Sequence, residues 1–142
     1  MNRFVITGLP RSRTAWFSAY LTQGDVICYH EAIPDGIELN LNEGTADCGY
    51  AICPIPCEKL VIIHRDWREV SRSLSDIGLP DEIGYLPILA EMLYDLNGLH
   101  VDFCDINDRL EEIHNYLGLP GYSRERAELF INMNIQSKEW SK

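Results

Sequence analysis

The residues with the clearest chemical potential form a short polar cluster near the N-terminus, Arg11-Ser12-Arg13-Thr14. The cluster follows an apolar run from Phe4 to Thr7 and a Gly-Leu-Pro turn, and it opens a segment with apolar residues at helical spacing. A strand, a tight turn and a helix N-terminus together form a phosphate-binding geometry, because the first N–H groups of a helix have no intrahelical partner and carry partial positive charge. The two arginines and two hydroxyls would add charge-assisted hydrogen bonds. The sequence therefore predicts an anion site here.

The turn differs from the nucleotide-binding loop of ATPases and GTPases, which reads Gly, four residues, then Gly-Lys-Ser/Thr. Counted from Gly8, the second glycine, the lysine and the hydroxyl residue of that loop would fall on Arg13, Thr14 and Ala15. The hydroxyl that binds Mg²⁺ in those enzymes is therefore missing at position 15. We expect phosphate binding here without ordinary magnesium-dependent hydrolysis of nucleoside triphosphates.

Two ionisable residues, His30 and Glu31, end the next apolar run, which begins at Val26. Strand, helix and strand in this order form a βαβ unit, which predicts parallel strands. Ligands of such sheets bind at the carboxyl ends of the strands. Because successive side chains of a strand point to opposite faces, we expect only one of His30 and Glu31 to face a site at this edge.

The clearest strand of the chain is Lys59 to His64, whose continuous apolar run is typical of an interior strand of a parallel sheet. It ends at Arg65, and Asp66 and Glu69 have the spacing of a capping box, so a helix should follow directly. Polar or ionisable groups thus follow three apolar runs. Their convergence at one edge of the sheet is the strongest reason in the sequence to expect a site.

The segment from Gly8 to Trp16, which reads Gly-Leu-Pro-Arg-Ser-Arg-Thr-Ala-Trp, resembles the 5′-phosphosulfate-binding loop of sulfotransferases. These enzymes use 3′-phosphoadenosine 5′-phosphosulfate (PAPS), and the usual form of their loop is Pro-(Arg/Lys)-Ser-Gly-Thr, so Arg13 stands where Gly is commoner. Arg65 and Ser73, eight residues apart, are similar to the arginine and serine that hold the 3′-phosphate of the cofactor in this family. The resemblance covers most of the chain and implies a P-loop-like fold.

The resemblance implies a set of cofactor-binding residues, some of which act through backbone N–H groups: Arg11, Ser12, Arg13, Thr14, Ala15, Trp16, Arg65 and Ser73. It also implies a catalytic set. Glu31 would be the general base that takes the proton of a hydroxyl acceptor, His30 is the second candidate base, and Arg11 would stabilise charge on the departing phosphate. The co-substrate would be PAPS, and no metal is required.

Simpler interpretations of the same residues stay open. Arg65 can form a surface ion pair with Asp66 or Glu69, and Glu31 can be a solvated or capping carboxylate. The chain can also be a small P-loop kinase-like phosphotransferase, or a non-catalytic nucleotide-binding or interaction protein on the same fold. The sequence leaves the acceptor, a small molecule or a macromolecule, unidentified, and a homo-oligomer is possible.

The remaining periodicity predicts a single domain over residues 1–142, with an α/β three-layer fold in which a parallel sheet is flanked by helices. We expect helices over Asp81–Asn97, Ile106–Leu117 and Ser123–Ile131, a strand over Leu99–Phe103, a short strand or irregular turn over Ile37–Leu41, a loop over Gly44–Gly49, and an irregular tail from Asn132.

Composition narrows the classes of partner and compartment. The net charge of −10 disfavours a general nucleic-acid binder, and no apolar run approaches the roughly 18–20 residues of a membrane span. Five cysteines, an odd number, in a chain that starts directly on a strand favour reduced thiols and a cytoplasmic protein. Their spacing matches no common zinc module, so we expect buried thiols rather than a metal site.

Overall fold

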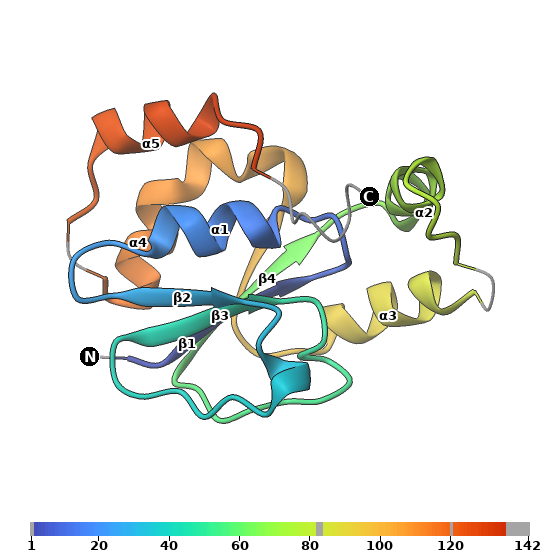
Figure 1. Ribbon diagram of the computed structural model, residues 1–142, viewed down its shortest axis with the longest axis horizontal. Helices are drawn as coiled ribbons and strands as arrows, with labels where there is room; N and C mark the ends of the chain where they lie inside the picture. The colour runs from blue at the N-terminus through green and yellow to red at the C-terminus, as the bar shows by residue number, and fades with distance from the viewer. Residues whose placement is uncertain (1, 82–83, 120, 136–142) are drawn as a thin grey trace.

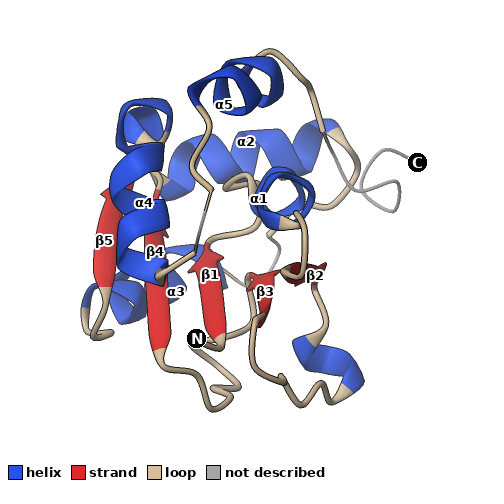
Figure 2. Ribbon diagram, turned by 90° about the vertical axis from the view of Figure 1, so that its left-hand side faces the viewer, coloured by secondary structure: helices blue, strands red, loops and turns tan. Residues whose placement is uncertain are grey.

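The computed structural model describes residues 2–81, 84–119 and 121–135. The centre of this part of the chain is a sheet of five parallel strands in the order β2-β3-β1-β4-β5, whose arrows point the same way in Figure 2. The strands are β1 (Phe4–Gly8), β2 (Ile27–His30), β3 (Glu43–Asp47), β4 (Lys59–His64) and β5 (Leu99–Asp102). The predicted α/β class and parallel sheet are confirmed.

Helices cover both faces of the sheet and make three layers (Figure 1). The described helices are α1 (Thr14–Leu21), α2 (Trp67–Asp76), α3 (Tyr85–Tyr94), α4 (Leu110–Leu117) and α5 (Arg124–Ile131). Apolar residues of α1, α4 and α5 pack on one face of the sheet, and those of α2 and α3 pack on the other. None of the described helices is long and apolar enough to cross a lipid bilayer.

The two faces of the interior strands explain the two apolar cores. Phe4 and Ile6 of β1 belong to the core beneath α1, whereas Val5 belongs to the core beneath α2 and α3. The side chains of β4 alternate in the same way, and β4 is buried from Leu60 to His64. The prediction that this strand lies in the interior is confirmed, since β1 and β5 pair with it on either side.

The predicted loop over Gly44–Gly49 is wrong, because residues 43–47 form β3, the strand that pairs with both β1 and β2. β3 contains no large apolar side chain, which hides it from hydrophobic periodicity. The missing volume at Gly44 is filled by Phe4, its register partner on β1. A Cβ atom on Gly44 would lie 2.3 Å from the Phe4 ring, so the strand needs glycine at this point.

The insertion of β3 also changes the sheet order. β1 and β2 are parallel, as the βαβ pattern predicts, but β3 lies between them. Residues 37–40 have no regular structure, so of the two alternatives for Ile37–Leu41 the irregular one is correct.

Helix boundaries follow identifiable caps. The side chain of Asp66 accepts a hydrogen bond from the Arg68 N–H at 2.9 Å, as expected of the residue that precedes α2. α3 is shorter than predicted, and the carboxylate of Asp81 accepts hydrogen bonds from the N–H groups of Tyr85 and Leu86 in its first turn. Pro87 lies in that same turn, where a missing N–H costs little. Part of the predicted segment, residues 82–83, lies outside the described residues, as do residues 136–142 of the tail.

We expect Gly44→Ala to lower the free energy of unfolding by about 1–3 kcal/mol, because the new methyl group overpacks against Phe4. Urea denaturation measures this loss. Adding Phe4→Leu to Gly44→Ala should recover part of it, although Phe4→Leu alone destabilises the wild-type protein. If the two substitutions are simply additive, the contact between Phe4 and Gly44 does not have the role assigned to it.

Candidate functional site

The loop after β1 turns tightly into α1 with two residues in an uncommon backbone conformation. Arg11 and Arg13 have φ angles of 65° and 68°, in the left-handed region that residues other than glycine rarely adopt. In the sulfotransferase loop that this segment resembles, Gly is common at the place of residue 13, and Gly enters the left-handed region at no steric cost. Arg13 therefore keeps the backbone shape that a glycine would favour, at the cost of some strain.

A close approach at Gly8 fixes where this loop begins. A Cβ atom on Gly8 would lie 2.8 Å from the carbonyl oxygen of Ile63 on β4 and 3.3 Å from Cβ of Ser12. The end of β1 and the loop therefore sit directly against β4. Ser12 is fully buried by this packing, and its Oγ has no hydrogen-bond partner among the described residues.

The start of α1 presents backbone N–H groups that have no acceptor within the helix. The first hydrogen bond of the helix runs from the N–H of Phe17 to the carbonyl of Arg13 at 2.9 Å. The N–H groups of Thr14, Ala15 and Trp16 precede it and so have no intrahelical acceptor. Arg13, the N-cap residue, makes no side-chain cap. This is the arrangement in which a helix N-terminus favours an anion.

A cavity of about 260 Å³ opens beside this helix start, at the carboxyl ends of β1, β2 and β4. Its walls come from elements far apart in the sequence, and Phe103, Asn134 and Ile135 help to close it. Eight of the ten residues that the sequence singled out line this one cavity: Arg11, Arg13, Thr14, Ala15, His30, Glu31, Arg65 and Ser73. The predicted convergence at one edge of the sheet is thus present.

Ser12 and Trp16 do not line the cavity. The Trp16 ring is buried in the core, where it stacks on Tyr20 at 4.7 Å between ring centroids. Its indole N–H donates to the carbonyl of Phe130 at 2.7 Å. Any contact of Trp16 with a ligand would therefore use its backbone N–H.

Arg11 and Arg65 join the loop to the second predicted anchor. The Nε of Arg11 donates a hydrogen bond to the Ser73 hydroxyl at 3.1 Å, and the guanidinium of Arg65 donates to the carbonyl oxygen of Arg11. Arg65 also forms the ion pair with Glu69 that the simpler interpretation expects, at 3.5 Å, and lies 4.1 Å over the Phe103 ring. Arg65 can therefore form this ion pair and still line the cavity.

Arg13 is held by contacts with α1 and with the segment after β5. Its guanidinium lies 4.0 Å over the Trp16 ring and donates to the side chain of Asn107 at 2.7 Å. Burial lowers the pKa of Arg13 to about 10, which still leaves the side chain cationic at neutral pH. The loop therefore brings two positive charges to the cavity, Arg11 and Arg13.

The expectation that only one of His30 and Glu31 faces the site is wrong, because both line the cavity. Glu31 follows the end of β2 and has a φ of 53°, so strand alternation stops before it. The Nε2 of His30 lies 3.3 Å from the Thr14 hydroxyl and 3.8 Å from the Glu31 carboxylate.

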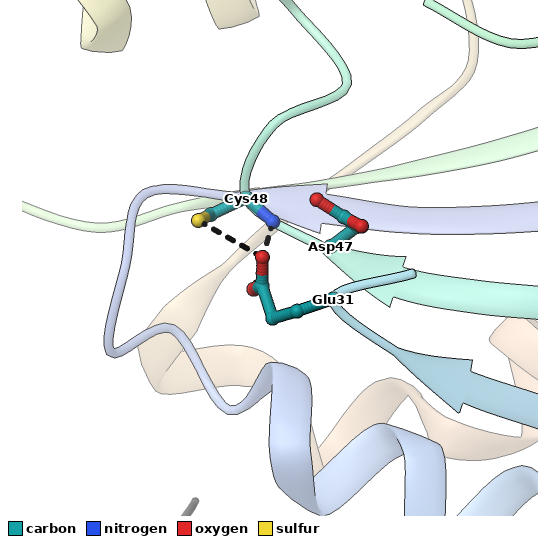
Figure 3. Close-up of side chains that lie close together, drawn as sticks. All are labelled: Glu31, Asp47 and Cys48. Atoms are coloured by element: carbon teal, nitrogen blue, oxygen red, sulfur yellow. Dashed lines mark hydrogen bonds between the residues drawn. The ribbon is translucent and has the colours of Figure 1, made fainter. Parts of the chain in front are cut away.

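Two neighbours of Glu31, Asp47 and Cys48 at the end of β3, could not be recognised from hydrophobic periodicity (Figure 3). The Glu31 carboxylate accepts hydrogen bonds from the backbone N–H of Cys48 at 3.1 Å and from its thiol at 3.4 Å. Asp47 is fully buried, and its two oxygens accept the N–H groups of Ile33 and Gly49, each at 2.8 Å. Recognising β3 in the sequence would have placed Asp47 and Cys48 at the same sheet edge as Glu31.

Glu31, Asp47 and Cys48 each offer one possible metal-ligand atom, and these three atoms lie within 4.8 Å of one another. Carboxylate oxygens and thiolates bind divalent metals such as zinc. Burial, and then the neighbouring carboxylates, raise the pKa of the Cys48 thiol, so in the absence of a metal ion Cys48 is a neutral thiol. In the structure, the three residues keep the Glu31 carboxyl group buried beside the Asp47 carboxylate.

Burial, and then the negative charge of Asp47, raises the pKa of Glu31 to about 7, and the hydrogen bonds from Cys48 oppose this rise. Glu31 is therefore divided between the acid and the carboxylate near neutral pH. A carboxyl group in this state can accept a proton there, as a general base must.

The raised pKa of Glu31 makes stability depend on pH. Between about pH 4.5 and 7 the folded protein holds a proton that the unfolded chain has released, so stability falls as pH rises through this interval. We expect Glu31→Gln to remove this contribution. The variant should therefore gain about 1–3 kcal/mol relative to wild type on going from pH 5 to pH 8.

Urea unfolding at the two pH values measures this change, and Glu38→Gln, at an exposed position, is the matched control. Comparing two pH values cancels any constant effect of the amide. An equal pH dependence in wild type and Glu31→Gln would show that Glu31 titrates as an ordinary carboxylate.

Comparison with known proteins adds nothing to this geometry. No known protein family matches the chain, and no curated protein is similar to it in sequence.

Proposed function

We propose that this protein binds PAPS and transfers its sulfonate group to a hydroxyl or amine acceptor. The observation that supports this most is that one cavity collects the start of α1, Arg11, Arg65, Ser73 and a carboxyl group of raised pKa. The residues resemble the two cofactor anchors of sulfotransferases, and the fold brings the two anchors into hydrogen-bonding contact.

The first anchor suits the 5′-phosphosulfate. Negative charge is favoured at the N-terminus of α1 by three features. These are the N–H groups that have no intrahelical acceptor, the helix dipole and the Arg11 guanidinium. Thr14 adds a hydroxyl that lines the same cavity. The buried Ser12 would act by shaping the loop, unless binding opens it.

The second anchor suits the 3′-phosphate. Arg65 and Ser73 come from the end of β4 and from α2, and both line the cavity. The Ser73 hydroxyl already accepts a hydrogen bond from Arg11, and it keeps its own proton to donate to a phosphate oxygen. Arg65 contributes a guanidinium that can bind a phosphate with two parallel hydrogen bonds.

In the proposed reaction the acceptor oxygen attacks sulfur in line with the bond to the 5′-phosphate. As the new S–O bond forms, the bond from sulfur to the bridging phosphate oxygen breaks, and 3′-phosphoadenosine 5′-phosphate (PAP) leaves. Glu31 takes the acceptor proton, and Arg11 together with the α1 N–H groups stabilises the charge on PAP. His30, between Thr14 and Glu31, is placed to orient the carboxylate or to relay the proton.

A non-catalytic nucleotide-binding protein is the second candidate. The size of the cavity favours it, since about 260 Å³ lies below the roughly 300–1,000 Å³ of sites that enclose whole ligands, which leaves little room for an acceptor. This candidate and the transferase share the binding step and differ in transfer alone.

We expect calorimetry to show micromolar binding of PAP and much weaker binding of ADP, which lacks the 3′-phosphate. Arg65→Ala should weaken PAP binding about tenfold or more, because it removes a charged hydrogen-bond donor. Ser73→Ala should weaken it less. Arg68→Ala is the control, since Arg68 lies on the same helix, is exposed and does not line the cavity. Failure of well-folded wild-type protein to bind PAP would exclude the transferase, and failure to bind ADP as well would count against the second candidate.

Transfer is tested separately with ³⁵S-labelled PAPS and a panel of hydroxyl and amine acceptors. We expect Glu31→Gln to abolish sulfonate transfer and to change PAP binding by less than about threefold, because the amide cannot accept the acceptor proton. The wild-type rate should rise with pH up to a plateau above about pH 7, where Glu31 is ionised. Binding of PAP without transfer to any acceptor would favour the second candidate.

A further inference from the structure

A larger cavity, of about 570 Å³, lies next to the first one and has no role in the proposed function. It is bordered by α2, α3 and the carboxyl ends of β4 and β5, on the side of the molecule where Figure 1 shows α2 and α3. Arg65 and Phe103 line both cavities and form the wall between them. We call this second cavity the α2–α3 groove.

The α2–α3 groove combines an apolar interior with an acidic border. Its apolar residues include Leu9, Pro87, Ala90 and Leu93, and four carboxylates stand around them: Asp66, Glu69, Glu91 and Asp102. Arg65 is the one Lys or Arg among the lining residues, and it pairs with Glu69. Asp66 pairs with Arg68, so the border keeps a smaller net negative charge, which favours a positively charged occupant.

Two aromatic rings of the groove already lie against cations of the protein. Arg65 lies over Phe103 at 4.1 Å, and Arg68 lies over Trp67 at 5.2 Å. The third ring, Tyr94, stacks on His64 with 4.0 Å between centroids and 10° between planes. Tyr94 is 65% exposed, so the face turned away from His64 is open. An aromatic face of this kind attracts a cation.

Two carboxylates stand near this open ring. Glu91 is one helical turn before Tyr94 on α3, and residues three apart share a helix face. Asp102 ends β5 and lines the groove together with Tyr94. Neither carboxylate forms an ion pair or a hydrogen bond with another described side chain or backbone group. Asp102 does interact electrostatically with Arg109 and His64, so the charge of Glu91 is the one most available to a ligand.

We propose that the α2–α3 groove binds an organic ammonium cation that carries an apolar group. Glu91, Asp102 and the open face of Tyr94 would hold the ammonium, and the partly exposed Pro87 and Ala90 would cover the apolar group. The charge of the groove excludes an anion such as a nucleotide. This proposal does not rest on the binding of PAPS.

The probe for this test is phenethylammonium, and its neutral control is 2-phenylethanol, which has nearly the same shape. In an NMR titration of the whole chain we expect saturable shifts of amides in α3 and at the end of β5 with the cation. The neutral compound should bind at least fivefold more weakly. Raising the salt concentration should weaken the cation alone. Equal binding of the two compounds would overturn the proposal, as would saturable shifts confined to another surface.

Single substitutions test the named residues. Glu91→Gln and Tyr94→Leu should each weaken phenethylammonium binding about two- to fivefold, since one removes a carboxylate charge and the other removes the aromatic face. Both positions are exposed, so folding should persist, and the amide spectrum verifies this. Glu111→Gln, at an exposed position of α4, is the matched control. If Glu91→Gln binds the probe as well as the control does, the assigned site is wrong.

Ser73→Ala separates this proposal from the proposed function. Ser73 lines the first cavity and not the α2–α3 groove. We expect this variant to bind phenethylammonium as wild type does, whatever its effect on PAP. If Ser73→Ala lost both PAP and phenethylammonium binding, the two cavities would act as one site. That result would overturn the proposal of a separate groove.

Discussion

The hydrogen bond from the Arg65 guanidinium to the carbonyl oxygen of Arg11 is the contact on which the geometry of the site depends. A non-glycine residue in the left-handed region costs on the order of 1–3 kcal/mol and persists where its surroundings hold it. Arg11 is held at both ends: Arg65 binds its backbone, and Ser73 accepts from its side chain. The glycine at position 8 lets this loop sit against β4, so the two anchors reach each other across adjacent strands. The strained loop and the second anchor therefore stabilise one another.

The cavity has two sides of different electrostatic character. Arg11, Arg65 and the α1 N–H groups make one side a place for anions. On the other side, burial and Asp47 keep the carboxyl group of Glu31 from ionising fully below neutral pH. Thr14 and His30 connect the two sides through a contact of 3.3 Å. A group that leaves as an anion and a group that gives up a proton would each find a suitable environment within one small cavity.

Much of this arrangement could be predicted from the sequence, and the failures have physical causes. Lys59–His64 was identified with its observed limits, because an interior strand of a parallel sheet is apolar throughout. β3 was missed because its core volume comes from Phe4 on another strand, which no local pattern reveals. Asp47 and Cys48 were missed with it. His30 and Glu31 were expected on opposite faces, since strand alternation does not foresee a backbone turn at the last residue. Hydrophobic periodicity cannot reveal contacts that depend on the register between strands.

The position of β1 in the sheet has a consequence for folding while the protein is being synthesised on the ribosome. β1 is the first strand to be made, yet both of its partners come later: β3 at residues 43–47 and β4 at residues 59–64. Until those segments emerge, an apolar strand exposes two unpaired edges, the condition that invites association with other chains. Both pairings span long stretches of chain, and such contacts form slowly. The anion-binding loop packs against β4, so it cannot take its final form until residues 59–64 have been made and have docked.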